Sequence, residues 1–401
     1  MPGESESGFG ERAFDPNKRV EWLLGDGPDA DVVLSSRVRL ARNLAGFPFI
    51  TRAKRTDMQQ VLDLCRDRLA HIGLCEDPPA EPGARRLEAE AALGLGRSLG
   101  LDAGTPAWVD LHRSTELEAK LLAERHLISA QHASGQVCKR RTTDEPRGVA
   151  VAQPGERVSV MVNEEDHLRI QAVRSGLRLE EALQIANEAD DRLEGGLDLA
   201  FSPRFGYLTA CPTNVGTGVR LSVMLHLPGL RMTGEIDKVR RAAADMGLAL
   251  RGSAGEGSEA LGDLYQLSNQ TTLGKSEQML LRELSEEVLP PVVRYERHAR
   301  SVLLEQRRIR LEDAVHRAVG TLCNARLVSL DESMNALSLV RLGIAAGLIG
   351  PRESESSVLQ LLLLVQPAHL QHTLGAALGQ EARKAARATL LRERLGSVLL
   401  G

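Results

Sequence analysis

The chain has 401 residues, of which 42% are hydrophobic and 26% are charged, and its formal net charge is -4. This length allows two domains and a substantial core, and the weakly negative charge argues against a nucleic-acid-binding protein. The five cysteines form no CxxC pair, which argues against a disulfide framework or a zinc site and favours a reducing compartment.

Neither the start of the chain nor its apolar runs indicate export or a membrane span. Segment 1–14 is polar and contains no apolar signal core. The longest apolar run, 358–365, is interrupted by Gln360 and is too short to cross a bilayer. We therefore expect a soluble cytoplasmic protein with no membrane segment and no nucleic-acid partner.

The first third of the chain begins with a polar lead at 1–30, rich in Gly, Glu, Asp and Pro. Segment 31–48 mixes β-branched residues with arginines, as in a strand that leaves a loop. Apolar residues at helical spacing follow at 56–72, which predicts a helix. Pro and Gly interrupt 76–104, which indicates a variable, loop-rich region.

The middle of the chain mixes strand and helix patterns. Residues 149–162 predict two short strands around a turn at Gln153. Segment 179–193 has the apolar spacing of an amphipathic helix. The apolar segment 221–227 fits a buried helix or a buried strand, because its spacing does not distinguish the two.

From Val302 onward the pattern is helical. Residues 311–322 place apolar side chains on one helix face. Ser329 and Glu332 form a capping box that opens the next helix, which we expect Gly350-Pro351 to end, and two more helical stretches follow. We therefore predict a polar lead at 1–30, a first domain at 31–295 and an all-helical domain at 296–401.

Two motifs have simpler explanations than a ligand site. LGKS at 273–276 resembles the end of a phosphate-binding loop, but Asn269 stands where the first glycine is required. HLQH at 369–372 lies in a leucine-rich helix with no carboxylate beside it, which indicates a pair on the helix surface and not a metal site.

Three short segments carry residues suited to binding charged groups. SSRVRL at 35–40 puts Arg37 and Arg39 on one face of an extended chain, where two guanidinium groups could chelate a polyphosphate. Taken alone, this segment fits a solvated strand edge better. His126 in ERHLIS has the default interpretation of a structural histidine. NEEDHLR at 163–169 has three consecutive acids, which repel one another unless a cation, a metal or helix N–H groups offset them.

Two glycine-rich segments complete the set. CPTNVGTGVR at 211–220 surrounds Cys211 with turn-forming residues, and Arg220 follows closely enough in sequence to favour a thiolate. RGSAGEG at 251–257 is a glycine-hinged loop with one arginine and one acid, which is typical of an active-site lid.

SSRVR, NEEDHLR, CPTNVGTG and the RG…GE loop, in this order, closely resemble the ATP:guanido phosphotransferases, which include creatine and arginine kinases. The resemblance covers about 31–290. The segments VRLGIAAGLI and LLLLVQPAHLQ, and the lack of room for the N-terminal helical domain of phosphagen kinases, resemble the protein-arginine kinase branch of the family. The resemblance implies an α+β fold: a phosphagen-kinase-like catalytic domain, with an antiparallel β-sheet flanked by helices, followed by an all-α C-terminal domain.

The resemblance also implies a set of site residues. Mg²⁺ would bridge the ATP phosphates mainly through water, with no protein metal site. Glu165 and Glu256 match the carboxylates that orient the substrate guanidinium and take up its proton. Cys211 matches a supporting cysteine beside it, while Glu164 and Asp166 would lie behind this layer or contact metal-bound water. The implied ATP-binding residues are Ser35, Ser36, Arg37, Val38, Arg39, His126, Arg169, Arg220, Leu221, Ser222, Val223, Met224, Arg251, Gly252, Ser253, Ala254, Gly255 and Glu256.

One segment departs from the family pattern. Protein-arginine kinases carry an RDxxRA motif that binds phosphoarginine as an allosteric ligand, and the corresponding segment here reads RKAARA. Arg383, Arg387 and Ala388 match, but Lys384 replaces the aspartate that would pair with the guanidinium. We expect weak or absent activation by phosphoarginine; a solvated helix face explains the segment equally well.

The function that the resemblance implies is a protein-arginine kinase of bacterial protein quality control and stress response. Its implied partners are proteins presenting arginine, a Clp-type protease or chaperone system, an activator protein and a second copy of the chain. A kinase for a small free guanidine is one alternative, which the missing N-terminal domain disfavours. A non-catalytic adaptor that binds phosphoarginine is the other, and the retained glutamates, cysteine and arginines disfavour it.

Overall fold

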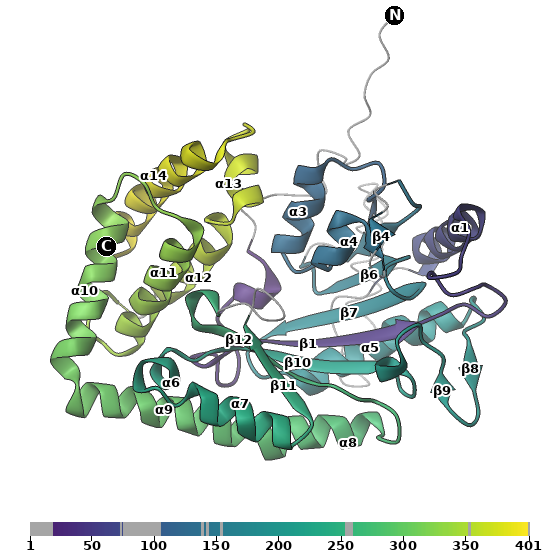
Figure 1. Ribbon diagram of the computed structural model, residues 1–401, viewed down its shortest axis with the longest axis horizontal. Coiled ribbons are helices and arrows are strands. Elements are labelled where there is room, and N and C mark those ends of the chain that lie inside the picture. Colours follow the sequence, from purple (N-terminus) through teal and green to yellow (C-terminus); the bar gives the residue numbers. More distant parts are fainter. Residues whose placement is uncertain are drawn as a thin grey trace, which may run out of the picture.

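The computed structural model describes residues 19–72, 74, 106–137, 140–141, 144–152, 155–252, 260–351 and 354–399. Its centre is an eight-stranded sheet in which all neighbouring strands are antiparallel (Figure 1). The strands predicted within 31–48 and 149–162 are confirmed. In spatial order the strands are β11 (Leu248–Gly252), β12 (Leu264–Asn269), β10 (Val219–His226), β1 (Val33–Arg42), β7 (Leu168–Ser175), β6 (Val158–Val162), β5 (Gly148–Val151) and β2 (Ala107–Asp110).

The apolar segment 221–227, which fitted either a helix or a strand, lies largely in β10. Leu221 pairs with Val38 of β1, and Val223 pairs with Leu267 of β12. Strand pairing on both edges satisfies the backbone N–H and C=O groups of this buried segment. Tertiary pairing, which the spacing of apolar residues does not reveal, therefore decides its conformation.

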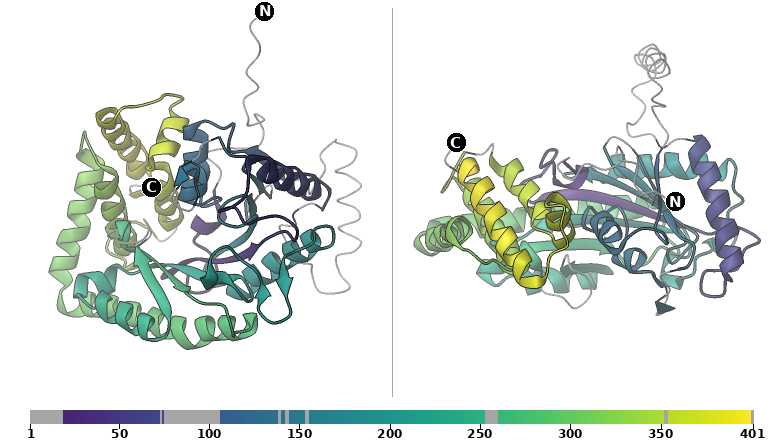
Figure 2. Two further views of the ribbon diagram at one scale, coloured as in Figure 1. Left: turned by 45° about the vertical axis from the view of Figure 1, so that its right-hand side comes forward. Right: turned by 90° about the horizontal axis from the view of Figure 1, so that it is seen from above.

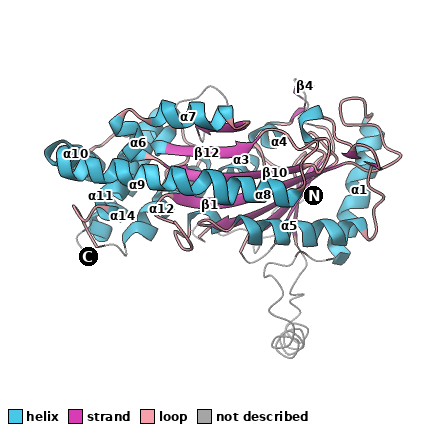
Figure 3. Ribbon diagram, turned by 90° about the horizontal axis from the view of Figure 1, so that it is seen from below, coloured by secondary structure: helices cyan, strands magenta, loops and turns pink. Residues whose placement is uncertain are grey.

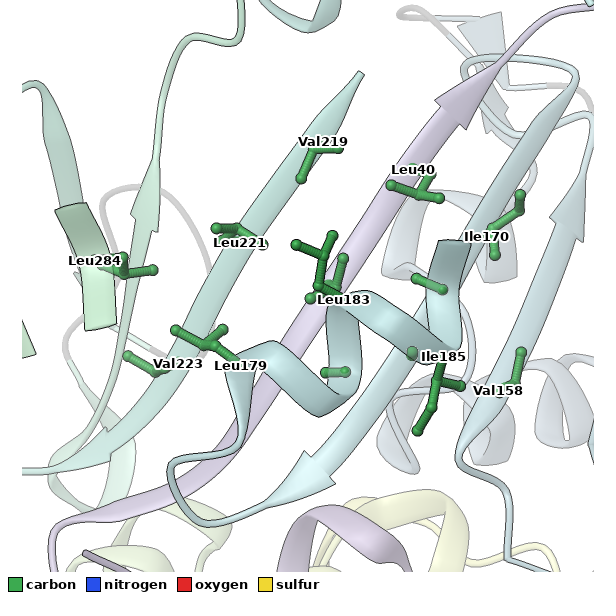
Figure 4. Close-up of a cluster of buried hydrophobic side chains, with 14 of the residues drawn as sticks. Leu40, Val158, Ile170, Leu179, Leu183, Ile185, Val219, Leu221, Val223 and Leu284 are labelled. Atoms are coloured by element: carbon green, nitrogen blue, oxygen red, sulfur yellow. The ribbon is translucent and has the colours of Figure 1, made fainter. Parts of the chain in front are cut away.

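One face of the sheet carries the main hydrophobic core. Alternate residues of the central strands, among them Leu40, Ile170 and Leu221, point to this face (Figure 4). The helix predicted at 179–193 is confirmed, and its residue Leu183 packs against these strands. Figure 3 shows α5, α8 and α9 across the same side of the sheet. The helices that contribute to this core include α1 (Arg55–Ile72), α5 (Leu179–Glu194), α8 (Glu277–Arg282) and α9 (Leu289–Gln306), the last two joined by a π-helical turn at Glu283–Val288.

The opposite face of the sheet is covered only towards its ends. Over β5 and β6, Val149 and Met161 pack against α3 (Glu116–Glu124) and α4 (Ala130–Ser134). Val173 and Met224 pack against the C-terminal helices and the short helix η1 (Glu21–Leu23). Between these two groups lies the polar part of the face, which contains the candidate site.

The C-terminal region is helical, as predicted, and has its own apolar core. The capping box is confirmed, because the Ser329 hydroxyl accepts from the Glu332 N–H and the Glu332 carboxylate accepts from the Ser329 N–H. The two helical stretches expected after it are three helices in the described part of the chain. This region comprises α10 (Arg308–Asn324), α11 (Leu330–Ala345), α12 (Glu355–Leu364), α13 (Pro367–Thr373) and α14 (Gln380–Leu399).

The prediction that Gly350-Pro351 ends the capped helix is wrong, because α11 stops at Ala345. Gly347 takes a left-handed conformation with φ of 68°. The N–H of Leu348 donates to the carbonyl of Gly343 at 2.9 Å, and the N–H of Gly347 donates to Ile344 at 3.0 Å. This bonding pattern is a Schellman motif, which satisfies the last carbonyls and ends the helix at the earlier glycine.

The domain boundary predicted at 295/296 falls inside α9. This helix packs on α6 (Pro228–Thr233) of the first part and on α10 of the helical part, so it belongs to both. The division of the chain at that point stays a prediction. The remaining described elements are η2 (Pro212–Asn214), η3 (Leu261–Asp263), α7 (Ile236–Asp245) and two small hairpins, β3 (Gln136–Val137) with β4 (Arg140–Arg141) and β8 (Phe201–Ser202) with β9 (Gly206–Tyr207).

Across the described ranges, every helix is too short or too polar to cross a membrane.

A buried ion pair joins the central strand to the helix behind it. Arg42 at the end of β1 and Asp190 of α5 are 1% and 6% exposed in their side chains, and their closest N–O distance is 2.6 Å. The Arg42 guanidinium also donates to the carbonyls of Ala41 and Thr217 and lies 3.5 Å from the ring centre of Tyr207. Burial raises the pKa of Asp190, and Arg42 opposes that rise.

Replacing Asp190 with alanine should therefore destabilise the fold strongly. The change leaves the Arg42 charge buried without its carboxylate, which costs about 3–5 kcal/mol. Chemical unfolding of Asp190→Ala and of Asp191→Ala, whose carboxylate is exposed on the same helix, measures the difference. The control should lose no more than about 0.5 kcal/mol. Equal, small losses in both variants would contradict the account.

Candidate active site

Four arginines lie together on the polar face of the sheet. Arg39 of β1 is paired directly with Arg220 of β10, and Arg37 lies two residues before Arg39 on the same face. Arg169 extends the group from β7, which pairs with the other edge of β1. Like charges directly opposite each other destabilise a sheet. A sheet that brings these positive charges together therefore requires nearby negative charges, from the protein or from a ligand, to offset their repulsion.

Burial and mutual repulsion disfavour the charges of two of these arginines, Arg37 and Arg39. Burial, together with Arg169 and Arg220, lowers the pKa of Arg37 to about 10. Burial and the neighbouring arginines lower the pKa of Arg39 well below its usual value. The Arg39 Nε is buried and has no hydrogen-bond partner among the described residues. Such a group of buried donors is suited to a ligand with several anionic oxygens.

Glu164 is the buried counter-charge of the cluster. Its Oε2 lies 2.5 Å from Nη1 of Arg169, and its Oε1 accepts from the hydroxyl of Ser129 at 2.6 Å. Although burial opposes ionisation, Arg169 and its other neighbours lower the pKa of Glu164 to about 2. The same ion pair raises the pKa of Arg169 despite burial. Glu164 thus pairs directly with an expected phosphate ligand, closer to the site than the sequence suggested.

Two side chains of β12 orient Arg37 and Arg220, and sequence reasoning missed both of them. Gln266 Oε1 accepts from Nη2 of Arg37 at 2.5 Å, and the hydroxyl of Ser268 accepts from Nη2 of Arg220 at 3.2 Å. Arg251 of β11 pairs with Gln266, so it belongs to the same face of the sheet. The alternation of polar residues within LYQLSN could have shown that Gln266 and Ser268 share one face of a strand. It could not have shown which arginines they contact.

The turn that carries NEEDHLR is held in place by buried polar contacts. Asn163 adopts a positive φ of 60°, and its side-chain amide donates to the carbonyls of Met58 and Pro146 at 2.8 Å. The carboxylate of Asp166 accepts from Asn43 and from the backbone of residue 210, both at 2.6 Å. Asp166 therefore fixes the turn through its Oδ1.

Glu165, between these anchored residues, is the uncommitted acid of the turn. Its carboxylate has no hydrogen-bond partner in the part of the chain that the structure describes, and the residue is half-buried. Burial raises its pKa, and the adjacent Glu164 and Asp166 raise it further. It opens onto a cleft lined also by Arg39, Glu164, Asp166, Arg169 and Arg220. A cationic group could thus be held beside an anionic one.

The loop after β9 reaches the same cleft through Asn214 and Gly218. It passes so close to the segment after β12 that a side chain at Gly216, where φ is 115°, would place a Cβ 2.9 Å from the Thr272 carbonyl. Cys211 is half-buried, and its sulfur lies 3.0 Å from the hydroxyl of Thr213. Its pairing with Arg220 and with a substrate stays a prediction.

An aromatic cavity adjoins the arginine cluster. His126 stacks on Trp22 with a centroid distance of 4.3 Å and an interplanar angle of 15°. Burial and the nearby Arg37 lower the pKa of His126 to about 3, so the imidazole is neutral. Neutral flat rings next to a phosphate site suit a nucleobase. The cavity contains several expected ATP ligands: Ser35, Arg37, His126, Ser222, Val223 and Met224.

Some expected ATP ligands do not direct their side chains to the cleft. Val38 and Leu221 lie in the apolar core on the other face of the sheet. The Ser36 hydroxyl donates to the carbonyl of Gly176 and accepts from the N–H of Arg178. Strand alternation separates these three residues from their neighbours in the motifs, so only their backbone adjoins the cleft.

The lid falls only partly within the described residues. Arg251 and Gly252 end β11, whereas Ser253, Ala254, Gly255 and Glu256 lie outside them. The expected role of Glu256 therefore stays a prediction.

The candidate allosteric segment 383–388 is part of α14 and is not a fully solvated face. Ala388 lies in the helical core, and Arg387 donates to the carbonyls of Val365 and Val328 at 2.8 and 3.0 Å. Arg383 donates to a nearby carbonyl at 2.9 Å, and Lys384 pairs with an exposed acid one turn earlier. Arg387 thus holds the helices together, and weak regulation by phosphoarginine stays a prediction.

Replacing Arg39 with methionine should stabilise the protein without ligand and weaken its binding of ATP. The change removes a half-buried charge that neighbouring arginines repel and whose Nε has no hydrogen-bond partner among the described residues, which should raise the free energy of unfolding by about 1 kcal/mol. The loss of charge-assisted hydrogen bonds worth about 1.5–3 kcal/mol should weaken ATP binding roughly tenfold to a hundredfold. Chemical unfolding and calorimetric titration measure the two effects.

Arg169→Met is the matched comparison, because Arg169 has a buried carboxylate partner. This variant should lose about 3 kcal/mol of stability as well as ATP affinity. If Arg39→Met were instead the less stable of the two, Arg39 would have a structural role that contradicts this description of the cluster.

Comparisons with known proteins identify the family of the chain. The family model described as ATP:guanido phosphotransferase, C-terminal catalytic domain, matches residues 99–299, and the Protein-arginine kinase McsB C-terminal domain matches residues 308–399. Protein-arginine kinase of Bacillus cereus (strain G9842) is 41% identical over 374 residues, which are 93% of this chain and 95% of that protein. The protein of the same name from Symbiobacterium thermophilum is 41% identical over 379 residues, with coverages of 94% and 96%.

Solved structures agree with the fold. The duplicated taurocyamine kinase from Schistosoma mansoni gives a TM-score of 0.53 at 24% identity, over 68% of this chain and 34% of that one. Lombricine kinase gives 0.51 at 22% identity, over 71% and 70%. These likenesses confirm the expected fold class. The chain belongs to the ATP:guanido phosphotransferase family, in its protein-arginine kinase branch.

Proposed function

We propose that this protein transfers the γ-phosphoryl group of ATP to the guanidinium group of arginine side chains in proteins. The observation that carries the proposal is the cleft in which Glu165, a carboxylate with no partner among the described residues, lies beside the arginine cluster. A cationic acceptor and an anionic donor can meet there. The relatives named Protein-arginine kinase, which match nearly the whole chain, support protein arginine as the acceptor.

The donor side of the cleft provides positioning and charge neutralisation, which dominate phosphoryl transfer. Arg37, Arg39, Arg169 and Arg220 would hold the phosphates, and neutral His126 would lie against the nucleobase. The lid arginine, Arg251, and the other lid residues would close over the nucleotide. Because Glu164 already compensates Arg169, the phosphates would relieve mainly the repulsion at Arg37 and Arg39.

The acceptor side must activate a poor nucleophile. A guanidinium group has a pKa above about 12 and no free lone pair. Glu165 would bind it, turn one nitrogen towards the γ-phosphorus and accept the proton that this nitrogen loses. The N–P bond forms as the bond from the γ-phosphorus to the bridging oxygen of ADP breaks. The raised pKa of Glu165 makes it a better proton acceptor than an ordinary carboxylate. Glu256 and Cys211 would assist from the lid and the glycine-rich loop.

Mg²⁺ enters the proposal as the ion that accompanies the nucleotide. The described residues contain no group of three His, Cys, Asp or Glu side chains that could hold a metal. The acids nearest the cluster are already engaged, Glu164 by Arg169 and Asp166 by Asn43. These residues fit an ion that is bound mainly by phosphate oxygens and water and that neutralises phosphate charge.

The cellular setting is proposed from the family resemblance. It comprises the cytoplasm, bacterial protein quality control and stress response, a Clp-type protease or chaperone system, an activator protein and a homodimer. The helical C-terminal domain, which matches the McsB C-terminal family model, is the part of the chain that supports this setting.

The direct experiment offers ATP and two acceptors, casein and free arginine, to the purified protein. Mass spectrometry under neutral conditions should find phosphate on arginine side chains of casein. Phosphorylation of free arginine alone would favour a small-guanidine kinase. Binding of phosphoarginine peptides without transfer to either acceptor would favour an adaptor.

Glu165→Gln should lower the transfer rate by about a hundredfold or more, because the variant cannot accept the proton. Its affinity for ADP, measured by calorimetry, should change less than about twofold, because among the described residues Glu165 forms no hydrogen bond or ion pair with the expected phosphate ligands. Glu164→Gln should differ, because it leaves Arg169 without its buried counter-charge and therefore alters nucleotide binding and stability. Near-normal transfer by Glu165→Gln would disprove the assigned role.

A further inference from the structure

One contact between the two parts of the chain has no role in the chemistry above. Glu124, the last residue of α3, contacts the start of α13, and Figures 1 and 2 show these two helices next to each other. Its Oε1 accepts from the N–H of Ala368 at 2.7 Å, and its Oε2 accepts from the N–H and from Nδ1–H of His369 at 2.9 and 2.7 Å. Three donors of the helical domain thus converge on one carboxylate of the catalytic domain.

This contact corrects the interpretation of HLQH as a pair on the helix surface. His369 is completely buried, whereas His372 is exposed. Burial lowers the pKa of His369, so its imidazole is neutral and Nδ1 carries the proton that it donates to Glu124. The acidic partner is 245 positions away in the sequence, and for that reason no carboxylate was visible beside the motif.

The position of Glu124 on its own helix is electrostatically unfavourable. A carboxylate in the last turn of a helix faces the negative end of the helix dipole, whereas the first turn of α13 offers free N–H groups and a positive end. Glu124 therefore stabilises α13 and not α3. Next to it, Arg125 forms a buried ion pair with Glu156 at 2.9 Å. The last turn of α3 is thus held by contacts on two sides.

That last turn places His126 in the nucleotide cavity. The N–H of Leu127 donates to the carbonyl of Leu122 and the N–H of His126 donates to Ala123, both at 3.0 Å, so α3 ends in a Schellman motif. The left-handed position of this motif is normally a glycine, but here His126 occupies it with φ of 62°. Such a conformation persists only where the surroundings impose it.

A second contact links His126 to the helical domain through Trp22 of η1. Trp22, which stacks on His126, belongs to the same apolar cluster as Leu359 of α12 and Leu337 of α11. Gln171 of β7 donates to the carbonyl of His126 at 2.6 Å from the other direction. The backbone and the ring of His126 are therefore both positioned, and two of the supports extend to the C-terminal helices.

We propose that Glu124 and His369 form a positioning pair through which the helical C-terminal domain holds His126 in the conformation that receives the nucleotide. The inference rests on the proposed function, since it takes the cavity at His126 to be the nucleotide site. Without the pair, the last turn of α3 loses one support and His126 can relax from its left-handed conformation. The apparent affinity for nucleotide then becomes the intrinsic affinity multiplied by the fraction of molecules in which His126 keeps the binding conformation. The transfer step, which uses Glu165 and the arginines, is unaffected.

The experiment compares Glu124→Ala and His369→Leu with two reference variants. His369→Asn keeps an N–H donor close to the position of Nδ1, and Glu116→Ala removes an exposed carboxylate from the same helix. For each full-length protein, calorimetry gives the dissociation constant of ADP, steady-state kinetics with casein give KM for ATP and kcat, and thermal unfolding verifies the fold.

We expect Glu124→Ala and His369→Leu to raise the ADP dissociation constant and KM for ATP about five- to tenfold, with kcat within twofold of the natural protein. His369→Asn should restore both constants to within about twofold, and Glu116→Ala should change neither. Unchanged ADP affinity in folded Glu124→Ala and His369→Leu would overturn the proposal. A parallel loss of kcat, affinity and thermal stability that His369→Asn does not rescue would also overturn it, because that pattern shows a contact that only holds the fold.

Failure of the proposed function would look different. If the natural protein bound ADP but phosphorylated no arginine, the ADP constants of the variants would still decide whether the pair positions His126.

Discussion

The accumulation of positive charge on one face of the sheet is the constraint on which the rest of the structure depends. Arg37, Arg39, Arg169 and Arg220 lie close enough to repel one another, and Glu164 is the buried acid that pairs within the cluster. The protein therefore keeps a charge imbalance in a partly buried cleft. A polyanionic ligand neutralises this positive charge, so the reduced repulsion among the arginines contributes to the free energy of binding.

The remaining architecture holds this unfavourable arrangement in place. Strand alternation directs the arginines to one face and the apolar core to the other, where α5 anchors the sheet (Figure 4). The buried pair of Arg42 and Asp190 fixes the end of β1, close to the glycine-rich loop. Asn163 and Asp166 fix the turn between β6 and β7, so that Glu165 alone in that turn presents an unpaired carboxylate. The buried polar contacts of this region thus position the backbone, and the Glu165 carboxylate remains available to a substrate.

Much of the fold followed from local patterns in the sequence. Apolar spacing identified α1, α5 and α10, and the capping box identified the start of α11. Long-range pairing was not accessible in this way: it decides that 221–227 is a strand and that Arg39 faces Arg220. The end of α11 was misplaced because Gly347 and Gly350 both fit a C-cap, and only the hydrogen bonds of the first distinguish them.

The candidate site was predictable at the level of motifs and less so at the level of side chains. Motifs named Ser36, Val38 and Leu221 together with the arginines, but strand alternation turns these three side chains away from the cleft. Gln266 and Ser268 could not be found, because their role depends on which strand lies beside β10. His369 was misjudged for the same reason, since its partner Glu124 comes from a distant helix.

The central claim is that the arginine cluster is a polyanion site whose charge Glu164 compensates only in part. Calorimetric titration with tripolyphosphate, which lacks a base and a ribose, tests it most directly. The account predicts saturable binding that weakens steeply as the salt concentration rises and that ADP abolishes by competition. Absence of tripolyphosphate binding under conditions in which ADP binds, or binding that is indifferent to salt, would contradict it.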